Sequence, residues 1–288
     1  MTTLCLSAKP LETETVRKAL DYLSLPTLGV EVRDDVFYFD LPPELGLSKT
    51  IIDQRLTPLA TTEQFDFALL EPEFTAEQFK LLAMDMDSTL ITIECIDEIA
   101  DYAGKKKEVS EITEAAMRGE IKDFAESLNR RVALLKGVPE SVLDSVYKER
   151  LRFSPGATEL LEFAKANDWK TLLVSGGFTF FTQRLQHELG LDFVKANTLE
   201  VVDGQLTGHV LGDIVDGEMK KQTVLQTCEQ LGIKPEQCIT MGDGANDLPM
   251  MGVSGVSVAF KAKPKVQAQT DFKINTGGLD TLVKWLSR

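Results

Sequence analysis

Four short apolar runs, each followed at once by polar or glycine-rich residues, constrain the fold of this chain more than any other feature. The runs are Phe79–Met84, Thr171–Val174, Cys238–Met241 and Val256–Phe260. Helical patterns lie between them, at Thr158–Asn167, Phe178–Leu189 and Glu218–Leu231. Buried strands that alternate with helices are typical of a parallel, doubly wound sheet. We therefore expect an α/β protein whose polar chemistry lies at the carboxyl ends of the strands.

Two insertions interrupt this alternation. Residues 92–151 contain no convincing strand and several amphipathic helical stretches, so we expect a helical cap there. Glu200–Thr207 predicts a β-hairpin with Asp203-Gly204 at its turn.

The first 72 residues predict a small separate domain. Its expected elements are a strand at Thr3–Ser7, a helix at Glu12–Leu23, a hairpin at Val30–Leu41 around Asp34-Asp35, a helix at 44–57 and a strand near Phe65–Leu69. The order β-α-β-β-α-β favours an α+β fold of the ferredoxin-like or ACT-like kind. Glu71-Pro72-Glu73 marks the boundary, so residues 76–288 are expected to hold the doubly wound core. Whether the small domain binds an amino acid, mediates homodimer formation or is a spacer stays open.

Composition narrows the class of protein. The formal net charge of −14 over 288 residues disfavours nucleic-acid and anionic-membrane partners. No apolar stretch approaches the roughly 18 residues of a membrane span. The four cysteines are far apart, without the spacing of a zinc site or a disulfide framework. Because the N-terminus also lacks a secretory pattern, we expect a soluble cytoplasmic protein.

Two carboxylates directly follow the first apolar run. Asp85 and Asp87 face the same side of an extended backbone, because residues i and i+2 do so. One can be a nucleophile and the other a proton donor, or both can approach a divalent cation. Taken alone, the pair is more simply explained as a strand end and turn.

The second and third runs also end in candidate site residues. Ser175 and Gly176 precede a helical pattern, where a hydroxyl and free N–H groups can bind an anion. Alone, a plain N-cap turn explains them more simply. Asp243, Asn246 and Asp247 offer the oxygen ligands that suit a hard cation, and a turn with an Asx-type cap explains them equally well.

Lys220 becomes a candidate site residue because of these three loops. An isolated lysine is usually solvated, but a phosphate site would need a cation, and Lys220 lies 23 residues before Asp243.

Together the motifs resemble the phosphoserine phosphatases of the haloacid dehalogenase (HAD) superfamily. The resemblance covers residues 78–288 and shows no departure at a catalytic position. It rests on Asp85-Met-Asp-Ser-Thr89, Glu94, Ile96-Asp-Glu-Ile-Ala100, Ser127–Leu135, Val174-Ser-Gly-Gly-Phe178 and Gly242-Asp-Gly-Ala-Asn-Asp247. It implies a HAD-like, Rossmannoid fold with a helical cap.

The resemblance also implies a reaction. This is Mg²⁺-dependent hydrolysis of O-phospho-L-serine to L-serine and phosphate, the final step of serine biosynthesis, through an aspartyl-phosphate intermediate. Asp85 would be the nucleophile and Asp87 the proton donor. Mg²⁺ would be bound by the carboxylates of Asp85 and Asp243 and the backbone carbonyl of Asp87, with Asp247 behind them.

The remaining roles implied by the resemblance concern the substrate. Ser175, the N–H of Gly176, Lys220 and Asn246 would hold the phosphate, Glu94 the ammonium group and Arg131 the carboxylate. The spacing to Asp243 favours Lys220 and leaves Lys221 as an alternative.

The position of Arg131 can also be argued from the residues. Ile121, Phe124, Leu128 and Leu135 recur at helical spacing and predict the inner stripe of a cap helix. Arg131 falls on that stripe, whereas Arg130 is rotated about 100° away. A charge on an apolar face needs a partner. The substrate carboxylate is the preferred partner, and snorkelling or pairing with a cap carboxylate is the alternative.

Two rival functions remain. Another phosphatase or phosphotransferase of the superfamily would share the core chemistry, so Glu94 and Arg131 are the discriminating residues. A binding protein with an inactive fold would be expected to lack Asp85 or Asp243, and the chain has both.

Overall fold

A seven-stranded sheet forms the centre of the molecule. The computed structural model describes residues 2–8, 12–25, 30–33, 35–117, 121 and 123–287. The strand order is β11-β10-β9-β5-β6-β7-β8. Neighbours from β11 to β7 are parallel, whereas β7 and β8 are antiparallel. The strands are β5 (Leu81–Met84), β6 (Lys170–Phe178), β7 (Phe193–Val202), β8 (Gln205–Leu211), β9 (Cys238–Gly242), β10 (Val256–Phe260) and β11 (Phe272–Ile274).

Helices bury both faces of this sheet. Leu82 and Met84 of β5 pack in the cluster that contains residues of α7 and α8. Leu81 and Ala83 face the opposite way and pack with Val224 of α9. Burial on both faces explains why the strand is uniformly apolar, and the doubly wound fold is confirmed. The core helices are α7 (Ala157–Ala166), α8 (Thr179–Leu189), α9 (Gly217–Leu231), α10 (Leu248–Met251), α11 (Pro264–Gln267) and α12 (Asp280–Leu286).

The N-terminal segment forms a second, four-stranded sheet. Its order is β2-β3-β1-β4, with every pair antiparallel, which is the ferredoxin-like arrangement expected from the sequence. Its elements are β1 (Thr2–Ser7), α1 (Thr13–Leu23), β2 (Val30–Arg33), β3 (Val36–Leu41), α2 (Lys49–Glu63) and β4 (Asp66–Leu70). Asp34 of the expected turn lies outside the described residues. The division into domains at residues 71–73 stays a prediction.

The predicted helix at 44–57 is wrong in its bounds. Helix α2 begins after Ser48, whose hydroxyl accepts a hydrogen bond from the N–H of Ile51 at 3.4 Å. The chain before it forms a separate short turn at Pro43–Leu45. The helix then continues through Pro58 to Glu63. An N-cap thus sets the start of α2, and the proline inside it does not end it.

The two insertions contact each other. The cap helices are α3 (Cys95–Tyr102), α4 (Lys106–Met117), α5 (Phe124–Ala133) and α6 (Ser141–Ser145). Strands β7 and β8 form the expected hairpin, with Asp203 and Gly204 both at positive φ. The backbone of Leu206 in β8 accepts a hydrogen bond from Gly137 at 2.8 Å and donates one to Val138 at 2.9 Å. The hairpin therefore holds one side of the cap.

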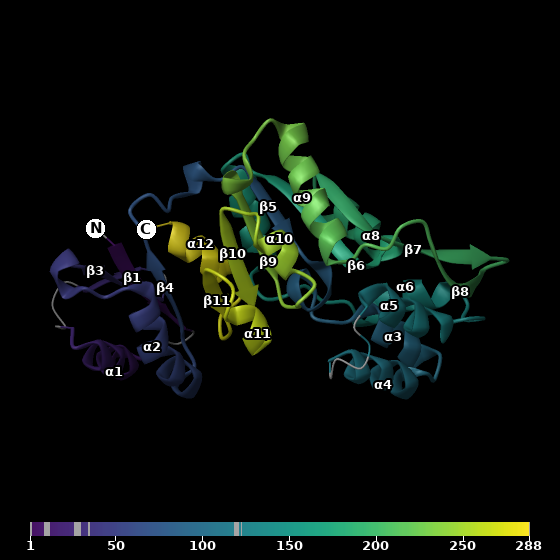
Figure 1. Ribbon diagram of the computed structural model, residues 1–288, viewed down its shortest axis with the longest axis horizontal. Coiled ribbons are helices and arrows are strands. Elements are labelled where there is room, and N and C mark those ends of the chain that lie inside the picture. The colour runs from purple at the N-terminus through teal and green to yellow at the C-terminus, as the bar shows by residue number, and fades with distance from the viewer. Residues whose placement is uncertain are drawn as a thin grey trace.

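The cap and the N-terminal sheet lie at opposite ends of the long axis, with the core between them (Figure 1). Short helical turns complete the chain at Ala76–Gln78, Met86–Leu90, Val146–Arg150 and Pro235–Gln237. Within the described residues, none of the helices combines the length and the apolar character that crossing a bilayer requires.

Candidate active site

Asp85 lies where β5 ends, and its N–H donates to the carbonyl of Met241 in β9 at 3.0 Å. The chain then turns sharply, with Ser88 in the left-handed region at φ +55°. Asp87 accepts a hydrogen bond from the N–H of Cys95 at 3.1 Å. A Cβ on Gly177 would lie 2.6 Å from Oδ2 of Asp87, so the end of β6 passes directly against this carboxylate. The two aspartates and the Ser-Gly-Gly segment therefore belong to one site.

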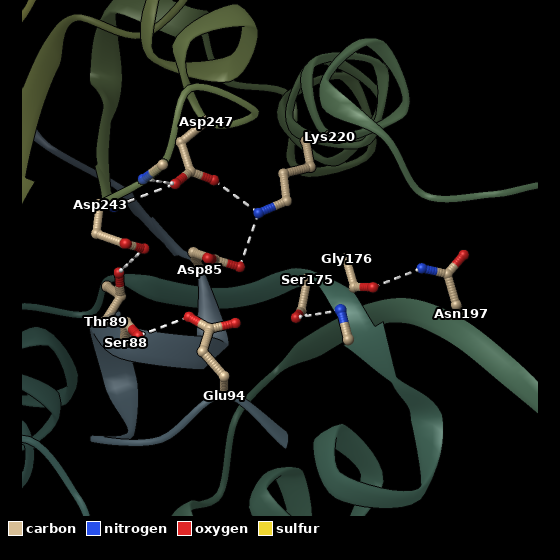
Figure 2. A network of polar contacts seen from close by, with 12 residues as sticks. Asp85, Ser88, Thr89, Glu94, Ser175, Gly176, Asn197, Lys220, Asp243 and Asp247 are labelled. Atoms are coloured by element: carbon tan, nitrogen blue, oxygen red, sulfur yellow. Dashed lines mark hydrogen bonds and ion pairs between the residues drawn. The ribbon is translucent and has the colours of Figure 1, made fainter. Parts of the chain in front are cut away.

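A buried lysine bridges two carboxylates of the site. Nζ of Lys220, from α9, donates to Asp85 at 2.7 Å and to Asp247 at 2.6 Å, and its side chain is 0% exposed (Figure 2). Burial alone would lower the pKa of Lys220, but the two carboxylates raise it above its usual value. The lysine is therefore a fixed positive charge. Lys221 lies outside this network, beside Glu218 at 3.4 Å.

Asp247 also orders the loop that contains Asp243. Its second oxygen accepts hydrogen bonds from the N–H groups of Asp243, at 3.1 Å, and Gly244, at 2.9 Å. Asn246 lies in the same loop, and a Cβ on Gly244 would be 2.3 Å from its Oδ1. Both oxygens of Asp247 are thus engaged by the protein.

Three carboxylates at the ends of β5 and β9 suit a divalent cation. One oxygen from each of Asp85, Asp243 and Asp247 lies within 4.8 Å of the others. Burial, reinforced by the charges of Asp85 and Asp247, raises the pKa of Asp243 to about 8. Burial likewise raises the pKa of Asp85 to about 7, with Lys220 opposing it. A divalent cation with oxygen ligands would offset this crowding of negative charge. Since Asp247 is already engaged, Asp85 and Asp243 are the better direct ligands.

The opposite wall of the site comes from the end of β6. The hydroxyl of Ser175 accepts a hydrogen bond from the N–H of Gly177 at 2.8 Å. The carbonyl of Gly176 accepts one from the amide of Asn197 in β7, also at 2.8 Å, and Asn197 in turn accepts one from the N–H of Val215 at 2.8 Å. Asn197 thus ties the segment before α9 to the Ser-Gly-Gly turn. Sequence reasoning missed Asn197, because a single asparagine in a strand has no motif around it.

Glu94 and Arg131 lie at the side of the site that faces the cap. Glu94 accepts a hydrogen bond from the hydroxyl of Ser88 at 2.6 Å, and its carboxylate points toward the space beside Asp85 and Ser175 (Figure 2). Burial lowers the pKa of Arg131, while the carboxylates of Asp97 and Glu94 oppose that shift. Arg131 stays positively charged despite this lowered pKa, because arginine does not lose its proton in proteins. Its charge therefore complements the carboxylates of Asp97 and Glu94. Asp97 belongs to the Ile96–Ala100 motif of the sequence analysis, which gave it no role of its own.

Helix α5 turns Arg131 inward and Arg130 outward. Arg131 donates through Nε to the carbonyl of Ser127 at 3.3 Å and is half-buried, whereas Arg130 pairs with Glu126 at 2.5 Å on the exposed face. The predicted stripe is too long for this helix, because Ile121 precedes it and Leu135 follows it.

Asp87 has the properties of a proton donor. Burial raises its pKa well above the usual value, and the negative charges of Glu94 and Asp85 add to that shift. The raised pKa favours the protonated form of this carboxyl group, which lies beside the Ser-Gly-Gly turn.

Comparison with known proteins agrees with this geometry. The family model described as haloacid dehalogenase-like hydrolase matches residues 79–255, which include every candidate site residue. The chain belongs to the haloacid dehalogenase-like hydrolases.

Individual members of this family are similar over most of the chain. A protein from Polaromonas sp., named phosphoserine phosphatase, is 59% identical over 74% of this chain and 92% of its own length. A HAD family hydrolase from Salmonella enterica serovar Typhi superposes with a TM-score of 0.88 at 35% identity, over 98% of both chains. A structure described as the phospho-aspartyl intermediate analogue of phosphoserine phosphatase matches 72% of this chain and 99% of its own, with a TM-score of 0.68 at 38% identity.

Proposed function

We propose that this HAD hydrolase is a phosphoserine phosphatase, which hydrolyses O-phospho-L-serine to L-serine and phosphate in a Mg²⁺-dependent reaction through an aspartyl-phosphate. One observation supports this most directly. The buried Lys220 holds the Asp85 carboxylate at 2.7 Å, and Ser175 and Glu94 lie beside this pair (Figure 2). Glu94 directly precedes α3, a helix of the cap. The names of the similar proteins point to the same substrate.

In the first half-reaction Asp85 attacks phosphorus. The bond between its carboxylate oxygen and phosphorus forms as the bond from phosphorus to the serine oxygen breaks. An alkoxide is a poor leaving group, so the serine oxygen takes the proton held by Asp87. Lys220, the Ser175 hydroxyl and the Gly176 N–H bind the non-bridging oxygens of the phosphoryl group. Mg²⁺ bound by Asp85 and Asp243 would supply further positive charge to the same oxygens.

In the second half-reaction water replaces serine. Asp87, now a carboxylate, takes a proton from a water molecule, and the water oxygen attacks phosphorus. The bond to Asp85 breaks, so the carboxylate is restored and phosphate leaves. Asn246 would orient the phosphoryl group, and Asp247 would keep Lys220 and the Asp243 loop in position through its hydrogen bonds to both.

Substrate selection is assigned to the cap side of the site. Glu94 would hold the ammonium group of phosphoserine, and Arg131 its carboxylate through two parallel hydrogen bonds. A phosphatase whose substrates lack the ammonium and carboxylate groups of an amino acid would not need Glu94 and Arg131 as oppositely charged binding residues.

Phosphate release from L-phosphoserine, compared with a panel of other phosphate esters, tests the proposal. We expect a clear preference for phosphoserine, loss of activity on exhaustive chelation and recovery on addition of Mg²⁺. Asp243→Ala should reduce both the rate and the response to Mg²⁺. Equal rates across the panel would instead favour a general phosphatase of the superfamily, and full activity after chelation would exclude the metal role.

Three further properties stay predictions. Production of L-serine would make this the last step of serine biosynthesis, and the cysteine pattern predicts a cytoplasmic location. A homodimer formed through the N-terminal sheet is the third, and sedimentation of the full chain would check it.

A further inference from the structure

A carboxylate of the N-terminal sheet fixes a loop of the catalytic core. Asp66, the first residue of β4, is only 2% exposed. Its Oδ1 accepts hydrogen bonds from the N–H groups of Asn275 at 2.6 Å and Thr276 at 3.1 Å. Its Oδ2 accepts from Thr276 at 3.2 Å and from Gly277 at 2.7 Å. These three residues follow β11. Because β11 is parallel to its neighbour β10, they lie on the side of the sheet that holds the carboxyl ends of the strands, as the active site does. One side chain therefore supplies the acceptors for three consecutive backbone donors.

The loop held by Asp66 is bonded in turn to α11. The side-chain amides of Asn275 and Gln267 exchange two hydrogen bonds, of 3.0 and 3.2 Å. Gln267 also donates to the carbonyl of Ala262 at 2.6 Å. The N–H of Lys261 donates to the carbonyl of Ile274 at 2.7 Å. The segment after β10 is thus tied to the segment after β11 at two points.

The segment after β10 borders the acidic loop of the site. The N–H of Lys263 approaches the carbonyl of Asp243 at 3.4 Å, and its ammonium group acts electrostatically on Glu94. A continuous series of polar contacts therefore leads from Asp66, through Gln267, to the backbone of Asp243. Asp243 is a proposed Mg²⁺ ligand. A shift of this segment would therefore displace Asp243 and change the affinity for Mg²⁺.

We propose that Asp66 is a positioning residue of the active site. By holding residues 275–277 it fixes α11 and Lys263, and through them the position of Asp243 for Mg²⁺ and the charge beside Glu94. The N-terminal sheet thus contributes to the catalytic geometry without touching substrate. This inference rests on the proposed function for its kinetic consequences, but its structural consequences can be measured separately.

Two other contacts between the same parts of the molecule provide matched controls. The hydroxyl of Tyr38 donates to the carbonyl of Lys284 in α12 at 2.8 Å. Lys273 of β11 pairs with Asp53 of α2 at 3.0 Å. These contacts join the N-terminal sheet to α12 and to β11 itself. Tyr38→Phe and Asp53→Asn therefore weaken the same interface away from the 275–277 loop.

The experiment compares Asp66→Asn and Gln267→Ala with the two controls in the full chain. Asparagine keeps the size of Asp66 but replaces one acceptor by a donor that faces backbone N–H groups. We expect each test variant to weaken Mg²⁺ binding, measured by calorimetry, about fivefold or more, a typical effect for residues that orient metal ligands. We also expect faster amide exchange in residues 261–267 and a fall in kcat/KM, whereas both controls should stay within about twofold of wild type.

The double variant decides whether the two residues act in series. If they do, Asp66→Asn with Gln267→Ala should weaken Mg²⁺ binding little more than the stronger single variant. Gln267 is only partly buried, so Gln267→Ala tests the path even if Asp66→Asn does not fold.

Three outcomes would overturn the inference. They are normal Mg²⁺ affinity in Gln267→Ala, equal losses in the test and control variants, and fully additive losses in the double variant. A wild-type protein that does not hydrolyse phosphoserine would contradict the proposed function instead. The Mg²⁺ affinity and amide exchange would still decide the role of Asp66.

Discussion

At the scale of single residues, the Asp85 carboxylate is the centre of the site because Lys220 neutralises it within the core. Asp85→Asn removes the charge and the nucleophile but keeps an oxygen that can accept the hydrogen bond from Lys220. We therefore expect a folded protein with almost no turnover of phosphoserine. Phosphate release is the measurement, and a thermal unfolding curve is the control for folding. Release at the wild-type rate would show that another group attacks phosphorus.

Arg131 provides the test of substrate recognition. Arg131→Ala should lower kcat/KM for phosphoserine, because the substrate carboxylate loses its paired donors. The expected decrease corresponds to a loss of about 2–4 kcal/mol in transition-state binding. Phosphoethanolamine lacks this carboxylate, so its turnover should change little under the same conditions.

Arg130→Ala is the matched control on the same helix, since Arg130 contacts Glu126 on the exposed side. Equal losses on both substrates would mean that Arg131 supports the cap instead of binding substrate. A loss in Arg130→Ala as large as that in Arg131→Ala would mean that the inward arginine was misassigned.

Candidate residues within motifs were predictable from sequence, and residues that support them were not. Asp85 and Ser175 directly follow an apolar run and Asp243 follows one after a single glycine, so the parallel sheet alone brings them to the carboxyl ends of its strands. Asn197 and Asp66 act through backbone partners that are distant in sequence. Their contacts depend on how strands and loops pack, and no local pattern encodes that.

At the scale of elements, the strands buried on both faces were the easiest to predict. β5 is wholly apolar, and β9 and β10 are mostly apolar, with Thr240 and Ser257 as their polar residues. β11 has only three residues, Phe-Lys-Ile, and lies at the sheet edge, so its alternation is too short to be distinguished from a loop. β6 extends beyond its apolar run because Phe178 pairs with Asn197 after an irregularity in the register. Tertiary pairing therefore sets strand ends that composition does not.

The hairpin and the cap make a prediction at this scale. Gly208 of β8 has φ +87°, and a Cβ there would lie 3.1 Å from Cβ of Lys136 and 3.3 Å from Cα of Ala133. Gly212, just after β8, has φ +73° with nothing within 4 Å of such a Cβ. Gly208→Ala and Gly212→Ala therefore share the backbone strain and differ in the contact with the cap.

We expect Gly208→Ala to lower the free energy of unfolding by about 1 kcal/mol more than Gly212→Ala does, because only the former crowds the cap. It should also raise KM for phosphoserine, since α5 and Arg131 lie next to the crowded segment. Denaturant unfolding and steady-state kinetics measure the two effects. Identical behaviour of the two variants would show that the cap tolerates displacement from the hairpin.

At the scale of the whole molecule, the N-terminal sheet is bound to the core by apolar as well as polar contacts. Residues of its strands, such as Val36 and Leu70, belong to the same buried cluster as Trp285 and Phe272 of the core. The sheet lies beside β11 and α12, away from the cap (Figure 1). The N-terminal sheet therefore stabilises β11, the edge strand of the seven-stranded sheet. This strand lies on the side of the molecule opposite to the cap, which contains Arg131 (Figure 1).

Deletion of residues 1–72 tests what this arrangement contributes. All proposed catalytic residues follow residue 84, so we expect a soluble truncated chain to retain phosphoserine turnover. Its stability should fall because the deletion exposes apolar side chains of β11 and α12. Its Mg²⁺ affinity should fall to the level of Asp66→Asn, because the acceptor for residues 275–277 is lost with β4. Unfolding curves, Mg²⁺ calorimetry and phosphate release on the same preparation measure the three quantities. A folded, soluble truncation without turnover would show that the N-terminal sheet completes the active site, a larger role than holding one loop.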